Sequence, residues 1–113
     1  MSQFKLNVQE PWFSLIFCGK KTVEGRLAKN KFTEMKVGDT IIFTNDSFSF
    51  ERKCVKKIKR INKYKSFREY LNNETIEKCL PTIKKIEQGV SIYRQFYSKN
   101  KEIKYGIIAI QFS

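Results

Sequence analysis

Histidine is absent from this chain, and other residue types that carry chemistry are scarce. Without histidine there is no Ser–His or Cys–His nucleophile pair and no imidazole ligand for zinc. The three cysteines, Cys18, Cys54 and Cys79, are widely spaced, which argues against a disulfide framework and indicates a reducing compartment. We therefore expect no metal and no cofactor, and any acid–base chemistry has to use Glu, Asp, Lys or Tyr.

Long apolar runs and flexible linkers are lacking too. The longest apolar stretches, 12–18 and 106–110, are far too short to span a bilayer, so we expect no membrane partner. The first residues show no secretory signal pattern. The 113 residues suit one domain over 1–113, expected to be a monomer by default and intracellular. A cytoplasmic location is expected, or a nuclear one in a eukaryotic or viral source.

Acidic residues are few compared with basic ones. Lys and Arg number 23 against 11 Asp and Glu, which gives a formal net charge of +12. Such a field favours polyanionic partners such as RNA or nucleotides. Drift toward AT-rich codons, which also favours Ile and Asn, is an alternative source of the lysines.

Aromatic residues are plentiful, with 10 Phe and 5 Tyr, and can build a packed core. Alternation over 4–8 predicts an opening strand, and the apolar residues after Pro11 predict a helix that ends at Gly19. Further strands are predicted at 22–27, 40–44 and 105–112, the last central because it is apolar on both faces. Residues 48–63 mix periods of two and three. A long strand bulged near Cys54-Val55 is preferred there over a strand followed by a basic helix.

Short helices are predicted in the second half of the chain. Ser66 and Glu69 form a capping box for a helix through Leu71. Residues 75–80 suit one or two helical turns ended by Pro81, and 89–97 carry an aromatic stripe. About five strands and three or four short helices predict an α+β fold with a mixed, barrel-like sheet.

Ionisable residues crowd into the segment 19–26, which contains Lys20, Lys21, Thr22, Glu24 and Arg26. In a simple strand, Lys20, Thr22, Glu24 and Arg26 share one face while Lys21 points the other way. Such crowding indicates either a binding or catalytic site or a solvated ladder of ion pairs.

A basic run lies between residues 51 and 68, where nine cations face a single acidic residue. Its candidate phosphate contacts are Arg52, Lys56, Lys57 and Arg60. The alternative is a solvated edge strand that lysines protect from aggregation.

A third group lies at 86–97. Glu87 precedes a glycine and suits a helix N-terminus, where a carboxylate is favoured. Tyr93, Phe96 and Tyr97 can stack a base, although aromatic residues at helical spacing also suit a core. The sequence alone leaves both roles open.

An ordered set of motifs spans nearly the whole chain. It comprises Pro11-Trp12-Phe13, Gly19-Lys20-Lys21-Thr22-Val23-Glu24-Gly25-Arg26, Lys36-Val37-Gly38-Asp39, Ile41-Ile42-Phe43, Cys79-Leu80-Pro81, Glu87-Gln88-Gly89, Ile92-Tyr93, Phe96-Tyr97 and Tyr105-Gly106-Ile107-Ile108-Ala109-Ile110. In this order the motifs resemble the ASCH domain family of the PUA-like superfamily. The resemblance implies a small PUA-like β-barrel flanked by short helices, a cleft facing 19–22, and association with RNA or modified nucleotides.

Some branches of this family are enzymes: one hydrolyses N4-acetylcytidine, and ribonuclease activity is ascribed to another. The amidohydrolase branch uses a Lys, a Thr three residues later and a carboxylate before the last helix. The resemblance places Lys21 and Glu87 at the first and third positions, but Glu24 stands where the Thr belongs. A threonine nucleophile is therefore missing. Glu24 can instead activate a water, with Lys21 polarising a carbonyl, or accept hydrogen bonds from a base amine. Use of Lys21 requires it to lie in a turn before the strand.

Three functions follow. The leading hypothesis is a module that binds RNA or a nucleoside or nucleotide ligand. The candidate ligand residues of its pocket are Lys20, Lys21, Thr22, Glu24, Arg26 and Tyr93. The second is a metal-independent hydrolase of an N4-acylcytidine or of RNA, with Lys21, Glu24 and Glu87 as candidate catalytic residues. The third is a basic protein-interaction domain. Neither spacing nor composition separates the first two.

Overall fold

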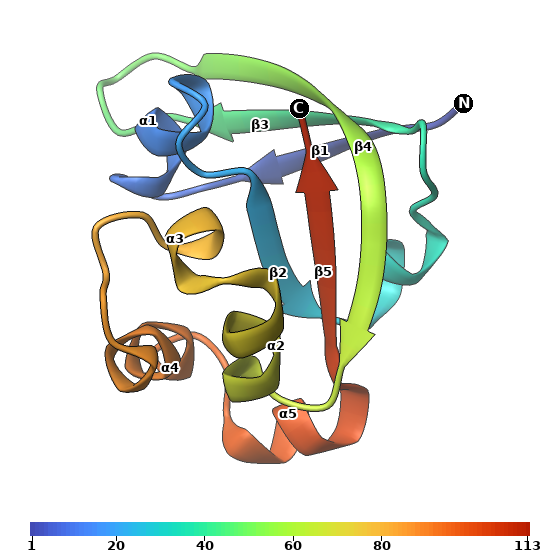
Figure 1. Ribbon diagram of the computed structural model, residues 1–113. Coiled ribbons are helices and arrows are strands. Elements are labelled where there is room, and N and C mark those ends of the chain that lie inside the picture. Colours follow the sequence, from blue (N-terminus) through green and yellow to red (C-terminus); the bar gives the residue numbers. More distant parts are fainter.

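The computed structural model describes residues 1–113 and has an α+β fold built on one strongly curled, five-stranded sheet (Figure 1). The strands are β1 (Gln3–Asn7), β2 (Val23–Leu27), β3 (Thr40–Asn45), β4 (Arg52–Tyr64) and β5 (Ile107–Phe112). Their order is β1-β3-β4-β5-β2, with β1 parallel to β3 and all other pairs antiparallel. The predicted α+β fold with a mixed, barrel-like sheet is confirmed.

Five α-helices and one 3₁₀-helix accompany the sheet. They are α1 (Trp12–Phe17), the 3₁₀-helix (Asn30–Glu34), α2 (Phe67–Glu74), α3 (Ile76–Cys79), α4 (Ile86–Arg94) and α5 (Lys99–Tyr105). The prediction of three or four helices was wrong because it missed α5, whose main signal is the cap in which Ser98 Oγ accepts a hydrogen bond from Lys101 N. The Ser66–Glu69 cap is present, but α2 continues past Leu71. No helix is long and apolar enough to cross a membrane.

Strand β4 is the long strand predicted from the ambiguous region, and it arches across the sheet in Figure 1. Its first half pairs with β3 and its second half with β5. The bulge was wrongly predicted near Cys54-Val55. The register shift lies instead between Ile58 and Arg60, where the strand passes from one partner to the other. An extra residue at this point increases twist and bending, which suits the curl of the sheet.

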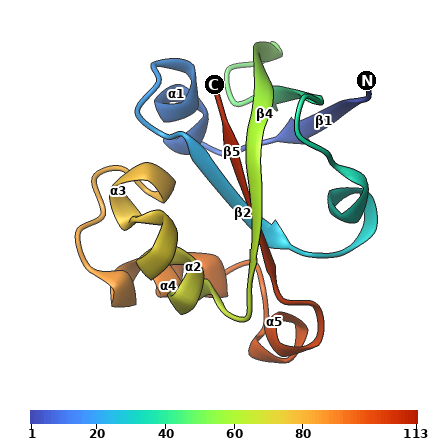
Figure 2. The same ribbon diagram turned by 45° about the vertical axis from the view of Figure 1, so that its right-hand side comes forward.

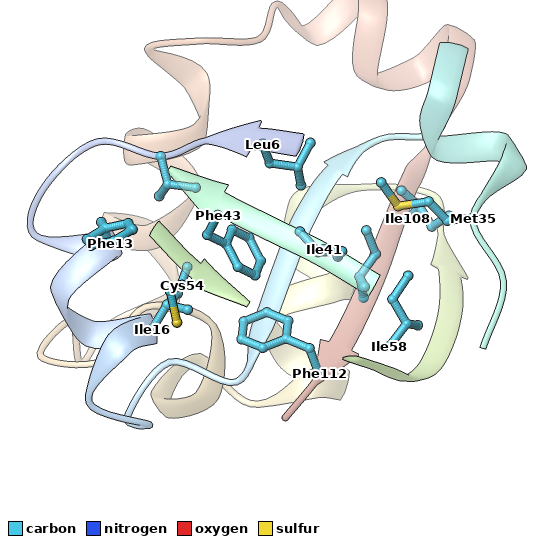
Figure 3. Close-up of a cluster of buried hydrophobic side chains, with 12 residues drawn as sticks. Leu6, Phe13, Ile16, Met35, Ile41, Phe43, Cys54, Ile58, Ile108 and Phe112 are labelled. Atoms are coloured by element: carbon cyan, nitrogen blue, oxygen red, sulfur yellow. The ribbon is translucent and has the colours of Figure 1, made fainter. Parts of the chain in front are cut away.

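Strand β5 separates two hydrophobic cores, which explains why both of its faces are apolar. Ile108, Ile110 and Phe112 belong to the first core, which Figure 3 shows between α1 and strands β1, β3 and β4. Ile107 and Ala109 belong to the second core, which is formed with β2 and helices α2 to α4. The prediction of a central final strand is therefore confirmed.

Helices α2, α3 and α4 stay together beside β2 in both ribbon views (Figures 1 and 2). Their residues bury the face of β2 and β5 that belongs to the second core. A short turn, 18–22, connects α1, which packs in the first core, to β2, whose Val23 and Leu27 belong to the second core. The segment 19–26 is thus held by packed elements on both sides.

Candidate functional site

The end of helix α1 determines where Lys21 lies. Gly19 has a positive φ of 84°, and its N–H donates to Ile16 O at 3.1 Å. Lys20 N donates to Leu15 O at 2.9 Å, which completes a Schellman-type C-cap. Because β2 begins only at Val23, Lys21 occupies the turn before the strand, as the family resemblance requires.

The Lys21 side chain is almost completely buried, with 1% of its surface exposed. Its Nζ donates to Val23 O at 2.7 Å and to Cys79 O, and it lies 3.2 Å from Glu24 Oε1. These three acceptors match the three protons of an ammonium group. Lys21 is therefore a fixed, saturated cation that organises the start of β2.

Glu24 projects from β2 between two cations. Its Oε1 faces Lys21, and its Oε2 accepts a hydrogen bond from Arg26 Nε at 2.8 Å. Burial acts to raise the pKa of Glu24, but the charges and hydrogen bonds of Lys21 and Arg26 outweigh it. The pKa therefore lies below its ordinary value of 4.5. The carboxylate is ionised at neutral pH, and each oxygen can accept one further hydrogen bond.

Gly25 allows an aromatic ring to lie directly against β2. A Cβ at this position would lie 2.4–2.6 Å from ring atoms of Tyr70 and 2.7 Å from its hydroxyl oxygen. The Tyr70 hydroxyl lies 3.1 Å from that of Tyr93, and Tyr93 stacks on Phe67 with ring centroids 4.5 Å apart. The glycine thus permits the packing that holds Tyr93 beside Glu24 and Arg26.

These residues border a cleft of about 250 Å³. It is lined by Asn7, Val8, Gln9, Trp12, Lys21, Glu24, Gly25, Arg26, Leu80, Ile92, Tyr93, Phe96 and Tyr97. The charged groups come from β2 and the turn before it, and the aromatic groups come from α1, α4 and the residues after α4. A concave site with apolar walls and a few converging polar groups is the usual form of a small-molecule pocket.

The structure brings four of the predicted pocket residues together: Lys21, Glu24, Arg26 and Tyr93. Lys20 is exposed at the end of α1, outside the cleft. Thr22 does not line the cleft either, and its N–H donates to Lys78 O. The prediction that Lys20 and Thr22 share a strand face with Glu24 and Arg26 was wrong, because the strand starts after them.

Glu87 lies outside the cleft. It is in the first turn of α4, its side chain is 72% exposed, and both of its oxygens accept hydrogen bonds from Arg68. These hydrogen bonds lower the pKa of Glu87. The structure does not bring Glu87 to Lys21 and Glu24, because its helix turns this position toward Arg68 and solvent.

The four predicted phosphate contacts on β4 divide into two pairs. Arg52 Nη2 donates to Glu10 Oε2 at 2.7 Å, and Arg60 Nη2 donates to Glu74 Oε1 at 2.7 Å. Lys56 and Lys57 form no ion pair. The two lysines are therefore free to meet an external anion, while the arginines already have carboxylate partners.

Several lining residues were not predicted as part of a pocket: Asn7, Val8, Gln9, Trp12, Leu80 and Ile92. They come from β1 and the loop after it, α1, the end of α3 and α4, which are far apart in the sequence. No local pattern distinguishes them from core or loop residues. The one sequence signal that connected these segments is the order of the motifs.

Comparison with known proteins gives consistent matches over nearly the whole chain. A family model described as the ASCH domain matches residues 6–113. The crystal structure of a hypothetical protein, PH0355, is 42% identical with a TM-score of 0.86, covering 98% of this chain and 97% of that one. The solution structure of protein PF0455 from Pyrococcus furiosus is 37% identical with a TM-score of 0.74, covering 98% and 96%.

A more distant match supports the fold alone. The crystal structure of an ASCH domain from Lactobacillus crispatus JV V101 has a TM-score of 0.67 at 14% identity, covering 99% of this chain and 79% of that one. No curated protein matches the chain. The similarity thus concerns the family and its fold.

Proposed function

This chain belongs to the ASCH domain family, and from that premise we propose that it is a binding module for RNA or a nucleotide-like ligand. The proposed module holds one base in the cleft beside Glu24. The observation that carries the proposal is an ionised, buried carboxylate, fixed by Lys21 and Arg26, in a cleft with aromatic walls.

The chemistry of the cleft matches that of a nucleobase. The carboxylate accepts N–H donors, which bases present on their edges as amino and ring N–H groups. Trp12, Phe96 and Tyr97 offer aromatic faces on which the flat surface of a base can stack. Because Phe96 is 54% exposed, one aromatic wall is open to an incoming ligand.

Hydrolysis has less support than binding. No Ser, Thr or Cys lines the cleft, and the three protons of Lys21 are already bonded. Burial holds the pKa of Tyr93 well above its ordinary value, and the lowered pKa of Glu24 makes that carboxylate a weak base. The arrangement therefore favours a Glu24 carboxylate that is fixed to bind a ligand over one that transfers protons in catalysis.

The test is a titration of labelled single-stranded RNA, and separately of nucleosides, into the wild type and Glu24→Gln. The amide keeps the size of the carboxylate but replaces one acceptor with a donor, so we expect affinity to fall about tenfold or more. Glu87→Gln is the matched control, because it makes the same change outside the cleft. Equal affinity of all three proteins, or no binding at all, contradicts the proposal.

The same samples separate binding from hydrolysis. After incubation with N4-acetylcytidine or short RNA, we expect chromatography to show unchanged compounds. Turnover by the wild type that Glu24→Gln abolishes would favour the hydrolase. Failure to bind any RNA or nucleoside, together with binding to an acidic protein, would favour the protein-interaction domain.

A further inference from the structure

The cleft presents a defined set of unused hydrogen-bonding groups. Lys21 is saturated, so it offers none. Arg26 Nε donates to Glu24 Oε2, and Arg26 Nη2 reaches Asn7 O at 3.5 Å. A guanidinium carries five N–H donors, so Arg26 keeps N–H groups for a ligand. The cleft therefore offers a donor from Arg26 beside two acceptor oxygens of Glu24.

The four RNA bases differ in how well they complement this set. The Watson–Crick edge of guanine carries an acceptor, O6, followed by two donors, N1–H and N2–H. Adenine and cytosine each place a bare ring nitrogen beside their amine, and its lone pair would face the carboxylate. Uracil has one N–H donor between two carbonyl oxygens, so one carbonyl would face the carboxylate. Guanine alone gives each oxygen of Glu24 a hydrogen bond.

Resting on the proposed function, that a base occupies the cleft, we propose that the cleft selects guanine. N1–H and N2–H of guanine donate to the two oxygens of Glu24, and O6 accepts from Arg26. Two N–H groups on a carboxylate form the same fork that makes arginine–carboxylate pairs strong and directional.

The aromatic walls supply affinity without this discrimination. Every base has a π-face, so stacking on Trp12, Phe96 or Tyr97 tolerates any sequence. Asn7 and Gln9 also line the cleft, but both are exposed, so the better-buried pair of Glu24 and Arg26 is the part that reads the base. A base that turns a ring nitrogen or carbonyl lone pair toward the carboxylate is repelled by it, which is why we expect the cleft to reject bases that lack two adjacent donors.

The experiment uses neutral nucleosides, so that phosphate attraction to the basic protein plays no part. Guanosine, inosine, 1-methylguanosine, adenosine and cytidine are titrated into ¹⁵N-labelled wild type, and amide shifts give each dissociation constant. Inosine lacks the N2 amine and 1-methylguanosine lacks N1–H. We expect inosine to bind about tenfold more weakly than guanosine. 1-Methylguanosine is expected to bind more weakly still, because its methyl group also meets the carboxylate.

Variants then connect the selectivity to the carboxylate. In Glu24→Gln the preference for guanosine over inosine is expected to collapse, whereas Glu87→Gln should retain it. The nucleoside titrations use the wild type alone, so they test guanine selection even if Glu24→Gln does not fold.

The two proposals fail differently. Equal binding of inosine and guanosine, or tighter binding of adenosine or cytidine, overturns guanine selection. If that binding still depends on Glu24, the proposed function stands. If neither the nucleosides nor short RNAs bind, both proposals fall together.

Discussion

The ionic group at the cleft, Lys21, Glu24 and Arg26, and the basic residues of β4 are both dense in charge, yet the fold treats them differently. Lys21 and Glu24 are buried and bonded to one another, and Arg26 completes the group. On β4, Lys56 and Lys57 stay free of carboxylates, and neither lysine lines the cleft. The difference indicates that charge density alone does not identify a site. What distinguishes the cleft is a buried, paired carboxylate that also borders a cavity.

The largest expected effect comes from breaking the buried group. Lys21→Met leaves the Glu24 carboxylate buried beside Arg26 alone and removes the donor to two main-chain carbonyls. We expect a loss of about 3–5 kcal/mol in the free energy of unfolding, measured by urea denaturation. Lys20→Met is the matched control on the exposed neighbour, where a change of about 0.5 kcal/mol or less is expected. Similar losses in both variants would refute the assignment of Lys21 to the buried group.

Gly25→Ala breaks the packing behind the same group. The new methyl would lie within 3 Å of the Tyr70 ring, so we expect a loss of about 3 kcal/mol in unfolding free energy and weaker RNA binding. Gly19→Ala is the comparison, because its surroundings are open and only the positive φ opposes a side chain. A loss of about 1 kcal/mol is expected there. If Gly25→Ala were the milder change, Tyr70 would not be packed as described.

Acidification provides a third test of the buried carboxylate. Because the folded-state pKa of Glu24 is lowered, its contribution to stability is present above the ordinary value of 4.5 and is lost as the pH falls through the folded pKa. The difference in unfolding free energy between wild type and Glu24→Gln should therefore be constant near neutral pH and shrink below pH 4.5. Thermal melts across this range measure it. A difference that grows on acidification would contradict the lowered pKa.

The smallest effect on stability is expected on β4. Lys56→Gln combined with Lys57→Gln removes one half-buried and one exposed charge, neither of them ion-paired, so the unfolding free energy should change by about 0.5 kcal/mol or less. RNA affinity should fall, and the slope of log affinity against log salt should become shallower by about 0.7 for each phosphate that the protein no longer neutralises. Lys99→Gln with Lys101→Gln removes the same charge from α5. An identical fall in affinity for both pairs would mean that net charge, and not β4, attracts RNA.

The sequence predicted those parts of the fold that local patterns encode. The final strand is apolar on both faces because β5 has a core on each side, and Ser66 caps α2 as its spacing with Glu69 indicates. Helix α5 was missed because its sequence is mostly polar, so its caps are almost its only signal. The bulge was misplaced because its position depends on where β4 exchanges β3 for β5, and pairing partners are not a local property.

The charged lining of the cleft and the aromatic residues of 93–97 were anticipated from the sequence, whereas the lining from β1, the loop after it, α1 and the end of α3 was missed. Glu24 and Arg26 alternate on a strand, and the C-cap at Gly19 is visible in the sequence, so their crowding could be recognised. Lys21 departs from the alternation expected of a strand because the helix cap at Gly19, and not the strand, directs its side chain inward. Glu87 was predicted as a site residue because of its place in the order of the motifs. Its pairing with Arg68 depends on how α2 and α4 pack.

The most direct test of the central claim is a crystal structure of the wild-type protein with a short guanine-containing RNA. We expect one base in the cleft, with two of its N–H groups within hydrogen-bond distance of the Glu24 carboxylate. The same carboxylate is expected to keep its contacts with Lys21 and Arg26. An RNA that lies only along β4, with no base beside Glu24, would contradict the account.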